Sequence, residues 1–304
     1  MPDSEDVCVL IPTLNEAETI GEVIGGFQER GFSNVLVVDG SSNDKTQEIA
    51  RSHDARVIEQ SGVGKGQAVR EGIESAESEY ILMLDGDGTY KPEDADVMLE
   101  PLDDGYEHVI GNRFANLENG SMTRLNRFGN RIINRAFSII HGQDFRDILS
   151  GYHAFSRKSA ERAYLTSDGF GVETELAVEC VKHSVPTTVV PITYEERPDE
   201  SETNLHPIWD GGDIIMTLYQ LAKTNNPLFY FGSVGFFSIF VGLLVGSYVG
   251  FEWFLATPRE SHEVLAVVAG VSIIFGVQLL MFGVLSDMIV TLHREQMRRI
   301  DERR

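Results

Sequence analysis

The sequence predicts an α/β domain built on a parallel sheet, followed by a hairpin of two membrane-spanning helices. Short apolar runs alternate with helical patterns up to Leu84, which is typical of parallel sheets covered by helices. Polar clusters follow directly on three of these apolar runs. Beyond Lys223, two long stretches carry no charge and therefore favour transmembrane helices.

The N-terminal alternation defines the elements of the predicted sheet. Apolar runs predict strands, and the periodic segments between them predict helices. The predicted strands are Val7–Ile11, Val35–Val38, Val57–Ile58 and Tyr80–Leu84, and the predicted helices are Ala17–Arg30, Asp44–Ser52 and Lys65–Ser75. In open α/β sheets, ligands bind at the carboxyl ends of the strands. We therefore expect the functional residues just beyond Ile11, Val38 and Leu84.

The two uncharged stretches are long enough to cross a bilayer. One lies between Lys223 and Glu252 and the other runs from Val264 to Ser286, and each exceeds the roughly 20 residues that a span needs. The alternative, two buried core helices of a soluble domain, is disfavoured by this length and by the glycines in the first stretch. The predicted parts are a domain at 1–205, an amphipathic juxtamembrane segment at 206–226, spans at 227–251 and 263–290, and a basic tail at 291–304.

Charges at the two ends of the chain predict its orientation in a cell membrane. The connection around Thr257–Arg259 is short, so both ends of the hairpin should lie on one side. The tail carries five arginines, which mark that side as cytoplasmic: Arg294, Arg298, Arg299, Arg303 and Arg304. The polar start at Met1–Asp6 is not typical of a signal peptide, so we expect the N-terminal domain in the cytoplasm as well.

Composition restricts the partners of the chain. Acidic residues outnumber basic residues 47 to 25, so nucleic acid is not an expected partner. Most of the basic residues are arginines, and with the acidic surface this bias indicates a chain that stays soluble in concentrated salt. Cys8 and Cys180 each lie in an apolar stretch and fit no metal spacing, so we expect reduced, buried thiols.

The strongest chemical signal is Leu84-Asp85-Gly86-Asp87-Gly88-Thr89. An apolar strand delivers two carboxylates one residue apart, and the glycines let a ligand approach closely. This arrangement suits a divalent cation that bridges a diphosphate. A calcium loop of the EF-hand type is excluded, because glycine and glutamate would be needed where Tyr90 and Asp96 stand.

The ends of the other strands carry weaker signals. Pro12 is expected to stiffen a turn and Glu16 to accept hydrogen bonds from a ribose or base, although such residues also form ordinary turns. Asp39 can hold the N–H donors of a uracil or guanine edge, whereas Asp44 is typical of a helix cap. The segment Gly62–Gly66, which contains Lys65, is either a diphosphate-binding turn or a simple flexible one.

These motifs, in this order, resemble family 2 glycosyltransferases, and the C-terminal spans resemble the dolichyl-phosphate mannose and glucose synthase group. The resemblance covers essentially the whole chain and implies a GT-A type nucleotide-binding sheet with helices on both faces. It implies inverting, metal-dependent transfer of a hexose from UDP- or GDP-hexose to dolichyl or another polyprenyl phosphate at the bilayer. Likeness to archaeal enzymes of N-glycan assembly favours UDP-glucose over a mannose donor.

The resemblance also assigns roles to residues. Asp85 and Asp87 would bind Mg²⁺ or Mn²⁺, with Asp87 the surer ligand. Gly111-Asn112-Arg113 resembles the family's Gly-Ser-Arg, and Tyr194-Glu195-Glu196-Arg197 resembles its Tyr-x-x-Arg. Arg113 and Arg197 thus become phosphate ligands, and Arg113 joins the two aspartates as a catalytic residue. The expected nucleotide-sugar contacts are Pro12, Leu14, Glu16, Asp39, Lys65, Asp85, Gly86, Asp87 and Arg197.

Two departures from the family pattern stand out. Thr89 occupies a place where many members have glutamine, and Glu202-Thr203-Asn204 replaces the usual serine, lysine and leucine. The lysine missing at Thr203 leaves part of diphosphate binding without a residue.

Arginines on a predicted helix between Thr123 and Ile140 point to the acceptor side. Arg124, Arg127, Arg131 and Arg135 form one stripe with apolar residues beside it. The stripe indicates an interfacial helix or, alternatively, a solvated face paired with nearby acids. The resemblance places the acceptor phosphate on Arg131. A second amphipathic segment, Ile208–Leu221, is expected along the membrane before the first span.

Glu173 and Glu175 leave the type of acceptor open. Either acid can act as a general base or can serve a helix terminus. A phosphate acceptor, with a second pKa of about 6, needs no base. The alternatives are a transferase that extends a glycan hydroxyl with Glu175 as base, and a scaffold that only binds nucleotide sugars. A sugar nucleotidyltransferase is disfavoured, because Pro12-Thr13-Leu14 stands where its glycine-rich loop would be.

Overall fold

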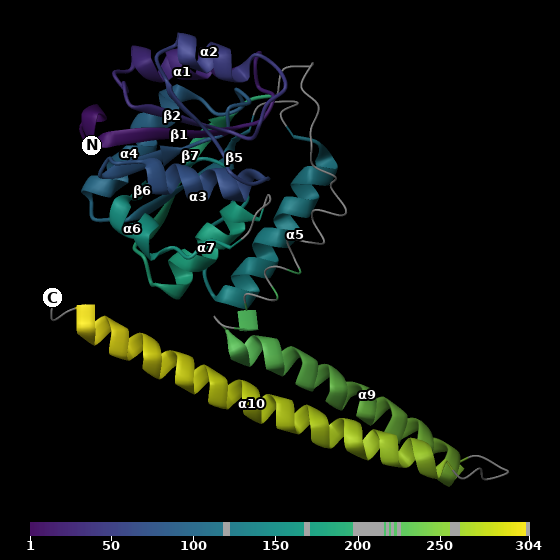
Figure 1. Cartoon of the computed structure of the whole chain (residues 1–304). Helices are drawn as coiled ribbons and strands as arrows, with labels where there is room; N and C mark the ends of the chain where they lie inside the picture. The colour runs from purple at the N-terminus through teal and green to yellow at the C-terminus, as the bar shows by residue number, and fades with distance from the viewer. Residues whose placement is uncertain are drawn as a thin grey trace. The chain divides into compact units, whose positions relative to one another are not determined.

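The computed structural model describes residues 1–117, 122–166, 171–196, 226–255 and 262–301, together with residues 216, 219, 222 and 223. The chain forms two compact units, Met1–Met216 and Thr217–Arg304. Figure 1 shows the sheet with its helices in the first unit and two long helices in the second.

The first unit is built on a mixed seven-stranded sheet with the order β3-β2-β1-β4-β6-β5-β7. Its strands are β1 (Val7–Thr13), β2 (Val35–Asp39), β3 (Arg56–Glu59), β4 (Tyr80–Met83), β5 (His108–Leu117), β6 (His153–Ser156) and β7 (Thr187–Tyr194). The predicted parallel arrangement is confirmed for β1 to β4, but β6 runs antiparallel to both β4 and β5. The chain enters β6 from the second half of β5, where Asp147 contacts Arg113. β6 therefore runs back toward the start of β5, in the antiparallel direction.

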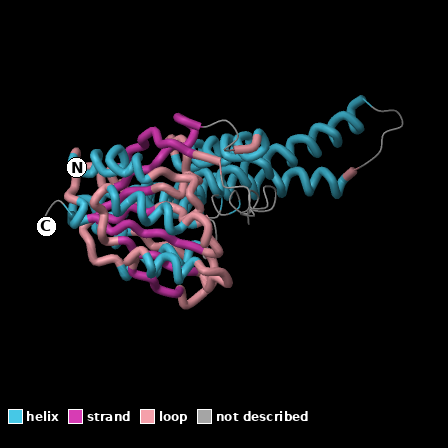
Figure 2. Tube along the Cα trace, turned by 90° about the horizontal axis from the view of Figure 1, so that it is seen from above, coloured by secondary structure: helices cyan, strands magenta, loops and turns pink. Residues whose placement is uncertain are grey.

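Helices cover both faces of this sheet, as Figure 2 shows. They are α1 (Ile20–Glu29), α2 (Thr46–Ser52), α3 (Lys65–Ser75), α4 (Ala95–Asp103), α5 (Arg124–His141), α6 (Arg157–Arg162) and α7 (Val172–Lys182), with short 3₁₀ turns at Ser4–Asp6 and Pro92–Asp94. Alternate side chains of β1 enter opposite cores: Val9 packs with residues of α1 and α4, and Leu10 packs with residues of α3 and α7.

Some element limits differ from the sequence prediction. β1 continues to Thr13, so Pro12 lies within the strand, opposite Val38, and the prediction that it stiffens a turn is wrong. Helix α1 begins only at Ile20, because the backbone N–H groups of Thr19 and Ile20 both donate to the carbonyl of Glu16 in a preceding turn. The limits predicted for α3 are those observed.

Both cysteines are free and buried, as expected. Burial raises the pKa of Cys8 to about 11 and that of Cys180 to about 12, so neither thiol is ionised near neutral pH.

Two buried histidines join β5 to β6. His153 Nε2 lies 2.8 Å from the carbonyl oxygen of Ser150, and its Nδ1 lies 2.8 Å from His108 Nε2. Two neutral imidazoles satisfy this geometry if each carries its proton on Nε2. His108 Nε2 then donates to His153 Nδ1, and His153 Nε2 donates to the Ser150 carbonyl. Burial lowers the pKa of His153 to about 4 and holds the pKa of His108 well below its ordinary value.

This histidine pair predicts acid sensitivity. Below about pH 6.5 the unfolded chain binds protons at these positions that the folded chain refuses, so the free energy of unfolding falls as the pH falls from about 6.5 to 4. We expect this slope to weaken in His153→Gln and to persist in a His53→Gln control. Thermal unfolding of the detergent-solubilised protein at a series of pH values measures it, and equal slopes in His153→Gln and the wild type would contradict the prediction.

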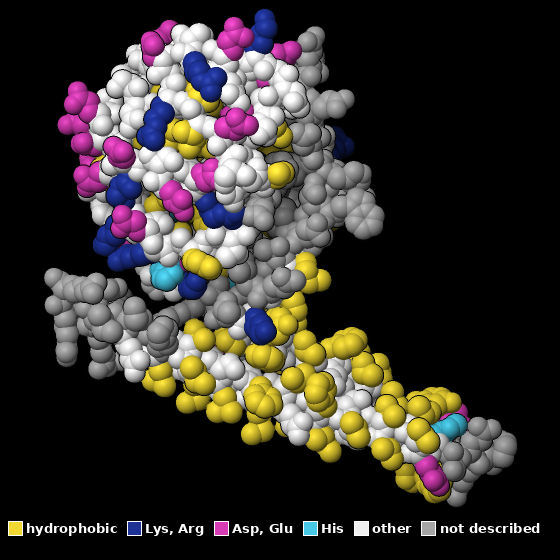
Figure 3. All heavy atoms as spheres, in the orientation of Figure 1, with side chains coloured by type: hydrophobic (Ala, Val, Ile, Leu, Met, Phe, Trp, Pro, Cys, Tyr) yellow, Lys and Arg dark blue, Asp and Glu magenta, His cyan; other side chains and the backbone are white. Residues whose placement is uncertain are grey.

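The second unit consists of the long helices α9 (Pro227–Leu255) and α10 (Glu263–Asp301). Over Pro227–Phe254 and Glu263–Leu292 they are long and apolar enough to cross a membrane. Figure 3 shows hydrophobic side chains exposed along both helices. The predicted spans fall inside these helices, whereas Ile208–Leu221, apart from Met216 and Tyr219, lies outside the described residues.

Glycines bring α9 and α10 close together, and the two helices lie side by side in both Figures 1 and 2. A Cβ atom on Gly235 would lie only 2.7 Å from the carbonyl oxygen of Gly276, and one on Gly276 would meet the carbonyl oxygen of Gly235 in return. Nearby, Ser238 Oγ donates to the carbonyl of Ser272 at 2.8 Å. Backbone contact of this kind requires residues without side chains.

We expect Gly235→Val to separate the two helices and to cost about 1–3 kcal/mol of stability through overpacking. Gly250→Val is the matched control, because a Cβ atom there has nothing within 4 Å. Thermal midpoints of the solubilised full chain should drop for the first variant and stay unchanged for the second. Equal midpoints in the two variants would show that close glycine packing does not hold the hairpin.

Candidate active site

The candidate site lies where the strand order of the sheet reverses. β1 is flanked by β2 on one side and β4 on the other, and such a switch point opens a crevice at the carboxyl ends of the strands. Residues after β4 pack directly against the end of β1, since a Cβ atom on Gly86 would lie 2.7 Å from Thr13 Cγ2. Thr19 Oγ1 fixes this loop by donating to the Gly86 carbonyl at 2.6 Å.

Hydrogen bonds connect the loops that follow β1 and β2. The N–H of Asn15 donates to Ser42 Oγ at 2.8 Å, and the N–H of Asn43 donates to Asn15 Oδ1 at 2.8 Å. The N–H of Glu16 donates to Thr46 Oγ1, also at 2.8 Å. These bonds bring the two loops together as one polar wall of the crevice.

The predicted nucleoside residues gather at this wall. Pro12 is buried, Leu14 is exposed and Glu16 is half-buried. Asp39 is fully buried, and its carboxylate accepts bonds from Ser42 N, Ser42 Oγ and Gln47 Nε2 at 2.9, 2.6 and 2.7 Å. A carboxylate offers about four lone-pair positions, so contact between Asp39 and a base remains a prediction. Asp44 accepts from the N–H of Thr46, the first residue of α2, although Lys45 and not Asp44 stands at the N-cap position of this helix.

Lys65 forms an ion pair with Asp85 just beyond the carboxyl end of β4. Lys65 is the first residue of α3, and its Nζ lies 2.5 Å from Asp85 Oδ1 and also forms an ion pair with Glu173 of α7. Burial opposes the charge of Lys65, but the two carboxylates outweigh it and raise its pKa. Burial raises the pKa of Glu173, and Lys65 counteracts that rise. Lys65, within the turn Gly62–Gly66, therefore places a fixed positive charge beside Asp85.

Asp87 is fixed by its own loop. Only 8% of the residue is exposed, and its Oδ1 accepts from the Thr89 N–H at 3.1 Å and from Thr89 Oγ1 at 2.6 Å. Gly88 between them has a φ of +74°, which glycine adopts without strain. Thr89, which departs from the family pattern, thus orients Asp87.

Asp85 and Asp87 fit a divalent cation that arrives with a phosphate ligand. Among the described residues, no group of three His, Cys, Asp or Glu side chains forms a cation cage. Mg²⁺ does not require one, because proteins commonly hold it through one or two carboxylates while substrate phosphates and waters complete the shell. Two carboxylates at the end of a buried strand meet that requirement.

The turn Ser150–Tyr152 packs against Asp85, a contact that was not predicted from the sequence. Gly151 leaves no room for a side chain, because a Cβ atom there would overlap the Asp85 carboxylate. Its N–H donates to Tyr90 Oη at 2.7 Å, and the ring of Tyr90 packs edge-on against Tyr152 and Tyr194. The sequence signals for this contact are the small residues at the start of the turn and the aromatic residue directly after the aspartate motif.

Arg113, predicted to bind phosphate, is already paired. Its Nε and Nη2 each lie 2.8 Å from the carboxylate oxygens of buried Asp147, and its backbone N–H donates to the same group. Burial opposes its charge, but Asp147 outweighs burial and raises the pKa of Arg113 well above its ordinary value. Asp147 uses one edge of the guanidinium, and Nη1 lies on the other edge. No pattern in the sequence pointed to Asp147.

Glu173 and Glu175 have separate environments despite their spacing in the sequence. Glu173 faces Lys65, whereas Glu175 accepts from Thr166 N at 2.9 Å and from Thr166 Oγ1 at 2.6 Å. Helix α7 has Gly171 as its N-cap and no side-chain cap bond, so neither acid caps it. Glu175 therefore secures the segment before α7, and Glu173 is the acid next to the aspartate pair.

The segment after β7 reaches the same loop. The N–H of Glu195 donates to the carbonyl of Thr89 at 3.0 Å, and Lys91 forms an ion pair with Glu195. Arg197 and Thr203 lie outside the described residues, so the predicted role of Arg197 stays a prediction.

Helix α5 carries the predicted arginine stripe. Its inner face is buried through Ile133, Phe137 and Ile140, and Thr123 Oγ1 caps its start by accepting from Asn126 N at 3.1 Å. Its outer face is exposed at Arg124, Arg127, Arg131 and Arg135 and also at Leu125, Phe128, Ile132 and Ile139. An exposed face that mixes arginine with large apolar residues is typical of a helix at a membrane interface.

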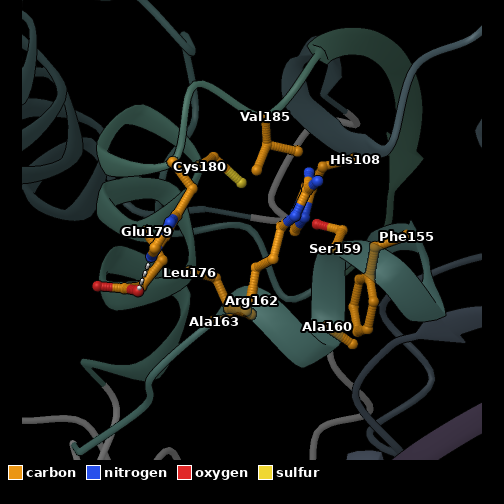
Figure 4. A pocket seen from close by; sticks show the side chains of 11 residues that line it. His108, Phe155, Ser159, Ala160, Arg162, Ala163, Leu176, Glu179, Cys180 and Val185 are labelled. Carbon is orange, nitrogen blue, oxygen red and sulfur yellow. Dashed lines mark ion pairs between the residues drawn. The ribbon is translucent and has the colours of Figure 1, made fainter. Parts of the chain in front are cut away.

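A separate cavity, shown in Figure 4, lies between His108, Phe155, α6 and α7. Its volume of about 10 Å³ has room for roughly one water molecule. None of the predicted site residues lines it, so it is not the candidate site.

The Arg113–Asp147 pair gives a stability prediction. Asp147→Asn removes the charge that compensates a buried guanidinium, and breaking such a pair costs about 3 kcal/mol or more. The matched control is Asp144→Asn, an exposed acid three positions earlier. Thermal unfolding of the solubilised protein should show a lower midpoint for Asp147→Asn alone. An unchanged midpoint would mean that the pair does not stabilise the fold.

Comparison with known proteins identifies relatives of this chain. A family profile described as "Glycosyl transferase family 2" matches residues 8–163. Glycosyltransferase AglJ of Haloferax volcanii is 63% identical over 303 residues, which cover 99% of both chains. A dolichyl-phosphate hexose transferase of the same organism is 34% identical over 72% of this chain and 94% of that protein. A dolichol-phosphate mannosyltransferase of Pyrococcus furiosus is 26% identical over 86% of this chain and 76% of that protein.

Solved structures support the fold. Glucosyl-3-phosphoglycerate synthase of Mycobacterium tuberculosis, in complex with Mn²⁺ and UDP-glucose, has a TM-score of 0.59 at 20% identity and covers 71% of this chain and 79% of its own. Together with the family profile and the 63% identical relative, the sheet and its aspartate motif identify this chain as a member of glycosyl transferase family 2.

Proposed function

We propose that this glycosyltransferase moves a hexose from a nucleotide sugar to dolichyl or another polyprenyl phosphate, and so supplies a lipid-linked sugar for protein N-glycosylation. The observation that carries the proposal is the pair Asp85 and Asp87 at the switch point of the sheet, beside the buried cation Lys65. The names of two relatives, a dolichyl-phosphate hexose transferase and a dolichol-phosphate mannosyltransferase, support the acceptor class.

UDP-glucose is the proposed donor. A solved structure of similar fold contains UDP-glucose and Mn²⁺, and this supports the choice over GDP-mannose. The nucleoside would lie against Leu14, Glu16 and Asp39, at the connected loops after β1 and β2. Its diphosphate would then reach the carboxyl end of β4.

The proposed reaction exchanges one bond at the anomeric carbon. An oxygen of the acceptor phosphate attacks this carbon as the bond to the nucleoside diphosphate breaks, so an α-linked donor gives a β-linked product. Mg²⁺ or Mn²⁺ held by Asp87 and Asp85 would supply charge neutralisation for the departing diphosphate. Lys65, Arg113 and Arg197 would add positive charge. The acceptor is already ionised near neutrality, so no general base is needed.

The membrane helices serve the proposed acceptor. A polyprenyl chain partitions into the bilayer, and anchoring by α9 and α10 raises the local concentration of the enzyme near it. The arginines on the exposed face of α5 would meet anionic headgroups, and Arg131 would receive the acceptor phosphate. The arginine-rich C-terminal tail supports a cytoplasmic orientation for the catalytic domain.

One assay tests this function. Membranes containing the protein, dolichyl phosphate and a panel of labelled nucleotide sugars should yield a labelled lipid with UDP-glucose. Asp87→Ala should reduce the rate by about 100-fold or more, as loss of a charge-stabilising group at a reacting centre does. Asp104→Ala, an exposed acid after α4, should leave the rate unchanged. A chelator should stop transfer, and Mg²⁺ or Mn²⁺ should restore it.

Three results would contradict the proposal. Full activity of Asp87→Ala would remove the aspartate pair from the mechanism. Transfer to a glycan hydroxyl in place of dolichyl phosphate would favour a glycan-extending transferase. Binding of nucleotide sugars without transfer to any acceptor would favour a scaffold.

A further inference from the structure

We propose that Glu173 is a positioning residue that holds the Lys65 ammonium at the diphosphate position of the donor. The inference deepens the proposed function and rests on it. It assigns to Glu173 a role that acts through Lys65 and not through proton transfer. The contacts of three elements carry it, namely the start of α3, the loop after β4 and the first turn of α7.

Lys65 is held between two acids. Its Nζ contacts Asp85 on one side and Glu173 on the other, and the exposed fractions of the side chains are 14% for Lys65, 26% for Asp85 and 6% for Glu173. A buried carboxylate is costly unless a cation pairs with it, so Glu173 and Lys65 require each other. Asp85, the most exposed of the three, is the one that a ligand in the crevice can reach.

Donor binding changes this balance. Asp85 would hold the cation of a metal–diphosphate complex, and Lys65 would then keep Glu173 as its one full counter-ion. Glu173 stays on the protein side and keeps the ammonium in place. An ammonium has three N–H donors, and the two contacts with carboxylates leave a third for a phosphate oxygen. Glu173 thus keeps Lys65 pointing into the crevice both before and after the donor arrives.

The lysine that the family pattern expects at Thr203 is replaced in this chain. Another residue must then supply positive charge to compensate the diphosphate. Lys65 is suited to this role, because it is a buried lysine already in contact with Asp85. Loss of Glu173 would let the flexible lysine stem take other rotamers, at a cost in donor affinity and not in acceptor affinity.

Helix α7 provides a matched control. Glu179 is also buried on α7 and also pairs with a lysine, Lys182, at 2.8 Å. It lies six residues further along the helix, and its other contacts are with Tyr164 and His183. A general effect of removing a buried acid from α7 would appear in both variants, whereas an effect transmitted through Lys65 would appear only at Glu173.

The test is a double-mutant cycle on the full chain in detergent. Glu173→Gln, Lys65→Met, the double variant and Glu179→Gln are compared by kcat, by KM for UDP-glucose and for dolichyl phosphate, and by calorimetric binding of UDP with and without Mn²⁺. We expect Glu173→Gln to raise the KM for UDP-glucose and the Kd for UDP by about tenfold, with the KM for dolichyl phosphate unchanged. In the Lys65→Met background the same change should have less than about a twofold effect. Glu179→Gln should match the wild type in these constants.

Several outcomes would overturn the inference. An undiminished effect of Glu173→Gln in the Lys65→Met background would mean that Glu173 acts on its own, and a loss confined to kcat would point to proton transfer. Equal changes in Glu179→Gln would indicate a general effect on α7. If Glu173→Gln lowers the thermal midpoint, Glu173→Asp, which keeps the charge at a shorter reach, must still give an intermediate Kd for UDP.

Failure of the proposed function is distinguishable from failure of this inference. A wild-type protein that binds UDP but does not transfer glucose to dolichyl phosphate contradicts the function. The UDP-binding cycle would still report whether Glu173 acts through Lys65.

Discussion

A lysine held between two carboxylates connects the fold of this protein to its proposed chemistry. Lys65 contacts Asp85 of the aspartate pair and Glu173 of α7, and these residues come from three separate parts of the chain. Each acid at this place adds negative charge to a site that, in the proposed function, also receives a diphosphate. A fixed ammonium and a bound cation are what make such a concentration of negative charge tolerable.

Other charged side chains around the site are also held in fixed positions by their neighbours. Asp87 is held by Thr89, Asp85 rests on Gly151, and Arg113 is locked to Asp147. Groups that are already oriented need not reorganise when charge develops on a leaving group, and many enzymes owe most of their rate enhancement to this preorganisation. Asp147 is fully buried and fixes the positive charge of Arg113 by pairing with it.

The framework and the main motif could be predicted from the sequence because these are local signals. The strands β1 to β4 and the helix α3 follow from periodicity, the two long helices follow from their uncharged stretches, and only Gly86 separates Asp85 from Asp87 in the sequence. The partners of these residues could not be predicted in the same way. Asp147 and Gly151 lie in the segment just before the antiparallel β6, and no local pattern showed that this strand would insert between β4 and β5.

The environments of Glu173 and Glu175 could not be predicted from the sequence. Glu173 and Glu175 are equivalent in the sequence, but neighbouring elements give them different partners, Lys65 for the first and Thr166 for the second. A residue two positions along a helix points about 200° away, so only tertiary packing decides which of the two faces the crevice. With Glu175 bound to Thr166, the acid next to the aspartate pair is already committed to a lysine. A site arranged in this way suits an acceptor that brings its own negative oxygen, and a phosphate does so.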